Sequence, residues 1–313
     1  MKTEVTPDRE AAVPLVSVVI PVYNQVELLD RCLRSLGRSR NVCLEVLVVD
    51  DASPEDPGEV AESYPFVRLL RSKRNVGYAA ANNLGLAEAR GQYLFFLNSD
   101  TEVPPDGIAH LVEVLTAEPK AGGVTPLHRE PTGLVQRTCF RFPTMKSGLL
   151  LDSVVHHLRR DHAVIRDFLL SDWDHESRRW VEHAQTSALL IRREVYDQLG
   201  GMDPELFLFY NDTDYCYRMH RAGFSILFVE DVEIIHHGGA SVRTFERVDA
   251  QVFGDRSRYF RKWYGWKGKC AVSLSLWSRI GYEALVELCH GQLRFAARKI
   301  ARGMKLHSTT GSR

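Results

Sequence analysis

A closely spaced pair of carboxylates and a double histidine lie within one short stretch of the chain, residues 211–241. Asp212 and Asp214 precede apolar residues at helical spacing, and His236 and His237 follow a strand-like run. Carboxylates and imidazoles are side chains that accept protons and bind divalent cations. Because the acids lie at a helix start and the histidines at a strand end, the two pairs can meet in one cleft.

Each of these residues also has a purely structural interpretation. Asp212 lies where the helix dipole favours any carboxylate. Asp214 and Arg218 have the spacing of an ordinary i, i+4 ion pair, worth about 0.3–0.5 kcal/mol. One of the two histidines can be structural as well. The rest of the chain must decide between these interpretations.

Alternating strands and helices in the first part of the chain predict an α/β fold. We expect strands at 15–24, 44–50, 67–70 and 93–100, and helices at 26–36, 55–63, 78–89 and 108–115. Such alternation is typical of a doubly wound parallel sheet, which binds ligands at the carboxyl ends of its strands. Asp50, Asp51 and Asp100 lie at such ends.

The later part of the chain is less regular. Residues 125–181 are rich in proline, histidine and arginine, and we expect a substrate-facing excursion there. We expect strands at 183–191, 226–229 and 232–235, helices at 193–199 and 212–222, and a long helix at 272–304. The predicted organisation is a disordered lead at 1–14, a catalytic domain at 15–241 and a basic, amphipathic helical region at 242–313.

Composition excludes several classes of function. The 40 basic and 40 acidic residues cancel, so nothing points to nucleic acid as a partner. Six scattered cysteines without a C-x-x-C pair fit a reduced, cytosolic protein. The polar N-terminus is not a signal peptide, and charged residues interrupt the apolar stretch 271–289, so no spanning helix is expected. The glycine patterns of dehydrogenases and P-loop proteins are missing.

Seven short motifs resemble, in order, those of a known family. They are 18–24 (VVIPVYN), 48–53 (VVDDAS), 75–78 (NVGY) with Asn83 and Gly85, 97–100 (LNSD), 200–203 (GGMD), 212–214 (DTD) and 236–241 (HHGGAS). Over roughly 15–241 the chain resembles an inverting family 2 glycosyltransferase of the bacterial rhamnosyltransferase-like branch. The resemblance implies the GT-A fold, a mostly parallel central sheet flanked by helices, here with a C-terminal helical extension.

The resemblance also assigns roles to residues. Asp212 matches the general base that takes a proton from the acceptor hydroxyl. Asp100 and His236 match ligands of Mg²⁺ or Mn²⁺, a cation that offsets charge on the diphosphate leaving group. The nucleotide-sugar site would comprise Pro21, Tyr23, Asn24, Asp50, Asp51, Asn75, Gly77, Asn83, Asn98 and Asp100. Within that set, Asp50 and Asp51 match the nucleobase pocket, which implies a uracil or thymine donor.

Structural interpretations of these matched residues stay open. His236 can be a capped imidazole, Asp50 a loop carboxylate, and residues 75–77 a plain turn. Two positions also depart from the family pattern. Asn211 replaces an acid before Asp212, so any raised pKa of Asp212 must come from burial. Asn98 replaces the first aspartate of the D-x-D-type motif, which removes one charge from the metal site.

The predicted function is transfer of one sugar, L-rhamnose by the resemblance, from a dTDP- or UDP-linked donor to a lipid-linked or saccharide acceptor in cell-surface glycan assembly. One alternative is a nucleotidyltransferase, which would want a glycine-rich basic loop where residues 21–24 (PVYN) stand. Another is a catalytically silent sugar-nucleotide-binding protein, which Asn98 and Asn211 leave open.

The C-terminal region predicts where the protein is located. Residues 291–313 contain six basic and no acidic residues, and an aromatic, basic cluster at 259–269 precedes them. Trp277, Ile280, Ala284 and Leu288 share one helical face. A basic amphipathic helix with aromatic flanks can lie on an anionic membrane. We therefore expect a cytoplasmic protein in peripheral contact with the inner face of the membrane, with a helix packed on the catalytic domain as the alternative.

Overall fold

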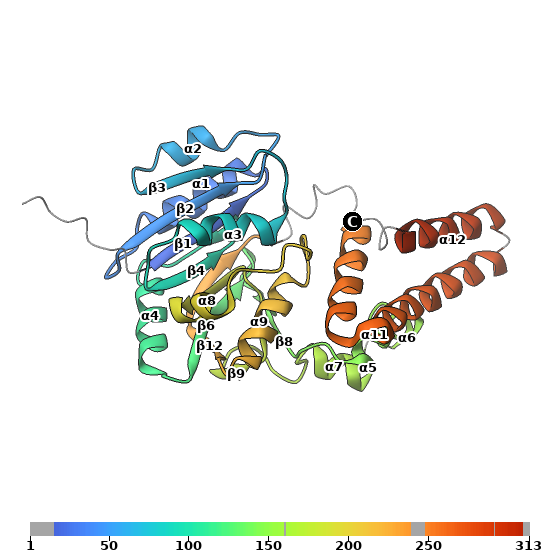
Figure 1. Ribbon diagram of the computed structural model, residues 1–313. Coiled ribbons are helices and arrows are strands. Elements are labelled where there is room, and N and C mark those ends of the chain that lie inside the picture. The colour runs from blue at the N-terminus through green and yellow to red at the C-terminus, as the bar shows by residue number, and fades with distance from the viewer. Residues whose placement is uncertain (1–15, 160, 239–247, 291, 309–313) are drawn as a thin grey trace, which may run out of the picture.

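The computed structural model describes residues 16–159, 161–238, 248–290 and 292–308. The lead expected at 1–14, the end of the 236–241 motif and the last basic residue, Arg313, lie outside these residues. Figure 1 shows an α/β body and, to one side of it, the long C-terminal helices.

The described residues build a central sheet of ten strands in the order β3-β2-β1-β4-β11-β6-β12-β5, with β7 paired to β6 and β9 to β12. The strands are β1 Val16–Val22, β2 Leu44–Asp50, β3 Val67–Arg71, β4 Tyr93–Leu97, β5 Thr101–Glu102, β6 Ala121–Arg129, β7 Val135–Gln136, β9 Arg179–Val181, β11 Ala188–Arg192 and β12 Ser225–His236. A small second sheet pairs β8 Cys139–Phe140 with β10 His183–Ala184. The mostly parallel central sheet that we predicted is therefore confirmed.

Four strands depart from the doubly wound parallel pattern: the short strands β5, β7 and β9 pair antiparallel at the margins of the sheet, and β11 does so in its interior. β11 runs antiparallel to both of its neighbours, β4 and β6. Its first residue, Ala188, pairs with Leu97 at the carboxyl end of β4, so the chain enters β11 from the edge of the sheet where the site lies. Because the chain comes back from the 125–181 region at this edge, β11 must run antiparallel to β4.

Helices cover both faces of the sheet. They are α1 Val26–Leu36, α2 Gly58–Glu62, α3 Tyr78–Glu88, α4 Gly107–Ala117, α5 Met145–Leu150, α6 Val154–Leu158, α7 Ala163–Phe168, α8 Arg193–Leu199, α9 Asn211–Arg221, α11 Val248–Cys289 and α12 Leu293–Ser308. Val18 and Ile20 of β1 pack with α1 and α4, while Val19 between them packs with α3. Burial on both faces explains why the parallel strands are continuous apolar runs.

The later elements differ from expectation in four places. Residues 183–191 form two strands in different sheets, β10 and β11. Residues 226–235 form one strand, β12, whose register shifts between Val229 and Glu233. The 125–181 region contributes β6 and β9 to the central sheet besides α5, α6 and α7. The helix expected at 272–304 is two helices, and α11 begins at Val248 with a kink at Gly265.

The C-terminal helices have a core of their own. Phe260, Val272, Leu276 and Ile280 form a buried cluster together with Leu206 of the α/β body. The apolar face expected at the membrane is largely inside, since Ile280 and Ala284 are 5% and 4% exposed. For Ile280 and Ala284 the packed-helix alternative is correct, whereas Leu288 of the same predicted face is 45% exposed. No helix in the described part of the chain has the length and apolar character needed to cross a membrane.

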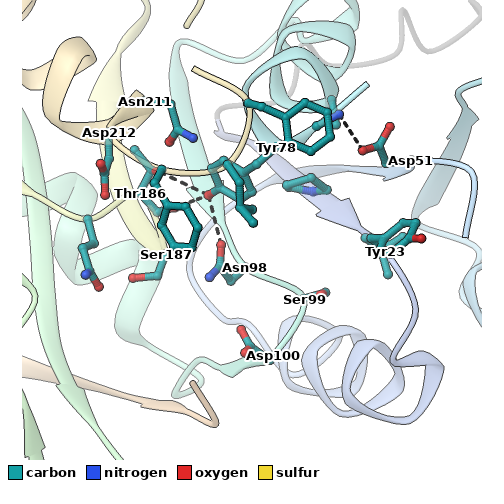
Figure 2. Close-up of a pocket in the computed structure, with 18 of the residues that line it drawn as sticks. Tyr23, Asp51, Tyr78, Asn98, Ser99, Asp100, Thr186, Ser187, Asn211 and Asp212 are labelled. Atoms are coloured by element: carbon teal, nitrogen blue, oxygen red, sulfur yellow. Dashed lines mark hydrogen bonds between the residues drawn. The ribbon is translucent and has the colours of Figure 1, made fainter. Parts of the chain in front are cut away.

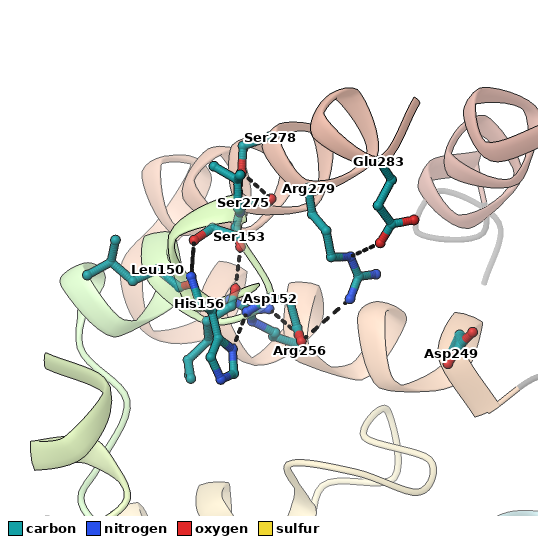
Figure 3. Close-up of polar contacts among 12 residues, drawn as sticks. Leu150, Asp152, Ser153, His156, Asp249, Arg256, Ser275, Ser278, Arg279 and Glu283 are labelled. Carbon is teal, nitrogen blue, oxygen red and sulfur yellow. Dashed lines mark hydrogen bonds and ion pairs between the residues drawn. The ribbon is translucent and has the colours of Figure 1, made fainter. Parts of the chain in front are cut away.

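A buried arginine joins the C-terminal helices to α5 and α6. Arg256 of α11 is 2% exposed and donates to Asp152 Oδ2 at 2.8 Å. Its other terminal nitrogen donates to the carbonyl oxygens of Gly148 and Leu151, as part of the cluster in Figure 3. A buried guanidinium needs such partners, because leaving it unpaired costs several kcal/mol, on the order of 3–5. The helical extension is thus fixed to the body of the protein.

Candidate active site

A pocket of about 290 Å³ opens at the carboxyl ends of β1 and β4. Nine of the predicted site residues line it: Pro21, Tyr23, Asp51, Asn75, Gly77, Asn98, Asp100, Asp212 and His236. In Figure 2, Tyr23 and Asp51 lie on one side of this pocket and Asn211 and Asp212 on the other, with Tyr78 and Asn98 between them. The fold therefore brings together motifs that are up to 215 residues apart, from Pro21 to His236.

Asp51 holds the 75–77 loop in place. Its two carboxylate oxygens accept the backbone N–H groups of Val76 and Gly77 at 2.7 and 2.9 Å. Burial raises the pKa of Asp51, although these two hydrogen bonds act in the opposite direction. Gly77 has φ +88, and a Cβ there would come within 2.5 Å of Phe207. Glycine is therefore required where the loop meets residue 207.

Three predicted nucleotide-sugar residues do not line the pocket. Asp50 accepts the backbone N–H of Ser53 at 2.9 Å. Asn83 makes two hydrogen bonds with the backbone of Met202, and the side-chain oxygen of Asn24 accepts from the N–H of Glu55 at 3.4 Å. These contacts hold loops around the pocket, and contact of Asn24, Asp50 and Asn83 with a nucleotide stays a prediction.

Asp100 and His236 lie next to each other, as a shared metal site requires. Asp100 Oδ1 is 3.3 Å from His236 Nε2. Gln136 fixes the imidazole: its Nε2 donates to the His236 carbonyl oxygen at 2.9 Å, so its Oε1 accepts from His236 Nδ1–H at 2.8 Å. The proton on Nδ1 leaves the Nε2 lone pair facing Asp100. Orientation of a histidine through its other nitrogen is characteristic of metal ligands.

This donor set fits a cation that is only partly held by protein. Among the residues that the structure describes, no three His, Cys, Asp or Glu side chains form a metal cluster. Asp100 and His236 would thus supply two ligands, and diphosphate and water oxygens the others. Mn²⁺ accepts the imidazole and the carboxylate together, whereas Mg²⁺ prefers oxygen.

Asn98 presents its side-chain amide to the same region. Its Nδ2 is 3.5 Å from His236 Nε2, and its Oδ1 is 3.0 Å from the Tyr78 hydroxyl. The Tyr78 hydroxyl is also 3.0 Å from the Thr186 carbonyl oxygen, so it lies between two acceptors. The Tyr78 hydroxyl has one proton, so it donates to only one of these acceptors, and Asn98 can present either its amide nitrogen or its amide oxygen to the Asp100–His236 region.

A buried histidine lies behind this wall of the pocket. Burial, followed by the neighbouring His236, lowers the pKa of His128 to about 3, so its ring is neutral at physiological pH. Its Nδ1 is 3.0 Å from the Pro126 carbonyl, which can only accept, and so Nδ1 carries the proton. Its Nε2 then accepts from the Ser187 hydroxyl at 2.9 Å. The Ser187 oxygen therefore offers only acceptor capacity to the pocket.

Asp212 lies at the start of α9, as predicted, with a side chain 20% exposed. Burial acts to raise the pKa of Asp212, but His183 and two hydrogen bonds from Thr213 outweigh it and hold the pKa below its usual value. The backbone N–H of Thr213 donates to Asp212 Oδ1 at 2.7 Å, and His183 Nε2 is 3.5 Å from Oδ2. The carboxylate is thus ionised at neutral pH, as a general base must be.

Asp214 has the structural role left open above. It is 0% exposed and lies outside the pocket lining. Arg218 Nε donates to its Oδ2 at 3.0 Å, the expected i, i+4 pair. Lys262 and Trp263 of α11 donate to its other oxygen at 2.8 and 2.9 Å. Asp214 therefore joins α9 to α11.

Several pocket residues escaped the sequence interpretation. They are Tyr78, Gln185, Thr186, Ser187, Phe207, Leu208 and Phe209 from the lining, with Gln136 and His183 directly behind it. One local signal could have identified residues 185–187. These three polar residues interrupt the apolar run 183–191, which indicates a loop between two strands. The remaining residues reach the pocket only through long-range packing.

A mostly parallel α/β sheet with carboxylates, an amide and an imidazole at its carboxyl edge is the arrangement that the resemblance to GT-A glycosyltransferases predicted. The model of the family "Glycosyl transferase family 2" matches residues 17–173, and the chain belongs to this family. The family predicted from the seven motifs is thereby confirmed, and the chain is an enzyme of the glycosyltransferase class.

Curated relatives include an L-rhamnosyltransferase and an O-antigen biosynthesis protein, both bacterial. An N-acetylglucosaminyl-diphospho-decaprenol L-rhamnosyltransferase of Mycobacterium tuberculosis is 29% identical over 241 residues, which is 70% of this chain and 75% of that protein. The O-antigen biosynthesis protein RfbC of Myxococcus xanthus is 27% identical over 265 residues, or 82% of this chain and 20% of that longer protein.

Solved structures share the fold at low sequence identity. The mannosyltransferase PcManGT of Pyrobaculum calidifontis, in complex with GDP-Man and Mn²⁺, is 19% identical with a TM-score of 0.57, covering 95% of this chain and 81% of that one. GalNAc-T7 with UDP, GalNAc and Mn²⁺ is 17% identical with a TM-score of 0.54, covering 83% and 54%. These likenesses confirm the predicted fold class.

Proposed function

We propose that this glycosyltransferase is an inverting enzyme that moves L-rhamnose from a dTDP- or UDP-linked donor to a lipid-linked or saccharide acceptor in cell-surface polysaccharide assembly. The observation that carries the proposal is the pocket itself, which joins an ionised Asp212 to the Asp100–His236 pair. The curated relatives support the choice of sugar and of acceptor.

In this proposal one side of the pocket binds the donor and the other side activates the acceptor. Tyr23, Asp51 and the 75–77 loop hold the nucleoside, and the Asn98 amide donates to a diphosphate oxygen. Asp212 takes the proton of the acceptor hydroxyl while the hydroxyl oxygen bonds to the anomeric carbon. The bond from that carbon to the diphosphate breaks on the opposite face. A divalent cation held by Asp100 and His236 would supply charge to offset the diphosphate as it leaves.

A donor screen tests the proposal. The full chain is incubated with Mn²⁺, a lipid-linked or free saccharide acceptor, and dTDP-, UDP- or GDP-sugars in turn, and release of nucleoside diphosphate is measured. We expect dTDP-rhamnose or a UDP-sugar to be consumed several-fold faster than any GDP-sugar. Equal or faster use of a GDP-sugar, the donor type bound by PcManGT, would contradict the assigned nucleobase. The Asp50→Ala and Asp51→Ala variants show whether either carboxylate contributes to that preference.

A cytoplasmic location at the inner face of the membrane belongs to the same proposal. The structure changes which residues would make the contact. Leu274, Leu285 and Leu288 of α11 lie at helical spacing on one face and are 61%, 58% and 45% exposed. On α12, Leu293, Ile300 and Met304 also share a face and are 72%, 42% and 56% exposed. Exposed apolar side chains among basic ones are typical of membrane-surface helices.

A further inference from the structure

A buried carboxylate outside the family match holds one wall of the pocket. Asp255 of α11 is 0% exposed. It accepts the backbone N–H groups of three consecutive residues, Phe207 at 3.3 Å and Leu208 and Phe209 at 3.0 Å each. All three of these residues line the pocket. A carboxylate buried against consecutive backbone donors fixes a segment strongly, because charge-assisted hydrogen bonds are about twice as strong as neutral ones.

Neighbours on α11 orient this carboxylate. Gln251 Nε2 donates to Asp255 Oδ1 at 2.8 Å, and Arg258 Nη1 donates to the same oxygen at 3.0 Å. Asp255 thus faces five donors, two on its own helix and three on segment 207–209. A buried charge needs this degree of pairing. The interaction is therefore between a fixed helix and a loop that has no regular structure of its own.

Segment 207–209 connects the two sides of the site. At one end, Phe207 lies against Gly77, within 2.5 Å of where a Cβ would stand. At the other end, Tyr210 has φ 60 and leads directly into α9 and Asp212. A displacement of this segment would consequently move both the loop assigned to the donor and the proposed base.

We propose that Asp255 is a positioning residue for the transfer reaction, and that α11 is part of the catalytic unit because it orders segment 207–209. The proposal rests on the function given above. A second contact of α11 also fixes the position of Asp212. Lys262 and Trp263 of α11 donate to Asp214 of α9, two residues after Asp212. Helix α11 thereby holds the residues on both sides of Asp212.

The test compares two Asp→Asn substitutions in the full chain. Asp255→Asn keeps the shape of the side chain but removes its charge and leaves one acceptor oxygen where the carboxylate offers two oxygens to five donors. Asp249→Asn is the matched control, because Asp249 is also an aspartate of α11 but is 59% exposed and pairs with Arg302 at the surface rather than with segment 207–209. Circular dichroism first shows that both variants fold.

Hydrogen–deuterium exchange supplies a readout that needs no substrate. We expect the amides of 207–209 to exchange about tenfold or more faster in Asp255→Asn, and at the wild-type rate in Asp249→Asn, because only the first replaces their charged acceptor with a neutral amide that has a single oxygen. Unchanged exchange in Asp255→Asn would overturn the proposal. If wild-type protein transferred no sugar at all, the proposed function would fail while this measurement still decided the positioning of the segment.

Steady-state kinetics test the catalytic consequence. With the donor found in the screen, Asp255→Asn should lower kcat about tenfold or more and raise the donor KM about threefold, since a misplacement near 1 Å is enough for such losses. A smaller folded fraction would lower kcat alone and leave KM unchanged. Asp249→Asn should keep both constants within about twofold of wild type. Wild-type constants in Asp255→Asn would show that segment 207–209 needs no carboxylate from α11.

Discussion

At the scale of single residues, the assignment of Asp212 as base requires its carboxylate to be ionised, and burial alone would raise its pKa and favour the neutral acid. Its pKa stays low because His183 and Thr213 together outweigh burial. The contribution of this ionised state to stability is complete above the pKa of an unfolded aspartate, about 3.9, and is lost as pH falls through the lower folded value. Across neutral pH the carboxylate is therefore always ready to accept a proton.

Replacement of Asp212 by asparagine keeps its shape and removes proton acceptance. We expect turnover to fall by roughly 10²–10⁴ while donor affinity hardly changes. Measurement of kcat beside nucleotide binding by titration calorimetry separates the two effects. Glu205→Gln, which removes one negative charge from an exposed side chain nearby in sequence, should behave as wild type. Near-normal turnover in Asp212→Asn would refute the assignment.

The His183→Asn variant tests what lowers the pKa of Asp212. Without the imidazole, burial is opposed only by the hydrogen bonds from Thr213, and the pKa of Asp212 should rise. The acid limb of the kcat/KM profile should then move to higher pH, with little change at about pH 8. A profile that coincides with wild type down to about pH 5 would mean that His183 does not set the charge of Asp212.

The proposed cation site makes a prediction about Gln136. Gln136→Leu removes the partner that keeps the proton on His236 Nδ1, so Mn²⁺ affinity in the presence of nucleotide should fall about tenfold. Asp100→Ala should weaken it further than His236→Ala, because it removes a charge. Electron paramagnetic resonance of free Mn²⁺ gives the affinities, with Thr132→Val on the same hairpin as control. Full activity in excess chelator would argue against any metal role.

At the scale of elements, the local sequence pattern was sufficient to predict a helix or strand wherever neighbouring residues in the sequence determine it. The strand at 44–50 and the helix at 193–199 have the predicted bounds, because apolar period and flanking residues specify them. Segment 183–191 could not be divided correctly, since β10 pairs with β8, more than forty residues earlier. Asp255 and Gln136 reach the pocket through contacts of the same long-range kind, which no local pattern records.

The 75–77 loop offers a test with an unusually close control. Gly77 and Gly133 both have φ +88, but a Cβ at Gly77 would meet Phe207 whereas Gly133 has nothing within 4 Å. Gly77→Ala and Gly133→Ala therefore both place a Cβ at the same positive φ, and only Gly77→Ala adds a clash with a neighbour. We expect donor affinity to fall about tenfold or more in Gly77→Ala and to stay unchanged in Gly133→Ala. Equal donor affinities in the two variants would show that the 75–77 loop does not contribute to donor binding.

At the scale of the whole molecule, the C-terminal helices have an inward and an outward apolar face. The inward face completes a core with Val272, Leu276 and Ile280, so a chain cut after Lys269 would lose folding contacts as well as any membrane surface. Some of the basic residues are also occupied, since Lys299 pairs with Glu283 and Arg302 with Asp249. Substitutions on the outward face are therefore the better test.

A Leu285→Glu, Leu293→Glu double variant places charge on the outward faces of both helices. We expect wild-type protein to pellet with anionic vesicles at low salt and to be released as salt rises, and the double variant to bind several-fold less. A control with Leu84→Glu changes an exposed leucine, 44% accessible, on α3 of the α/β body. If all three proteins sediment equally, the outward faces do not contact the membrane.

The place of Asp255 in the chain has a consequence for biosynthesis. Translation delivers the protein from its N-terminus, and the described residues that line the pocket end at His236. Every one of them has been synthesised before the ribosome adds Asp255. A nascent chain halted in between therefore contains the whole pocket lining and lacks the carboxylate that orders segment 207–209. Competence for sugar transfer would then arise late in translation, when α11 emerges from the ribosomal tunnel and packs against α5 and segment 207–209.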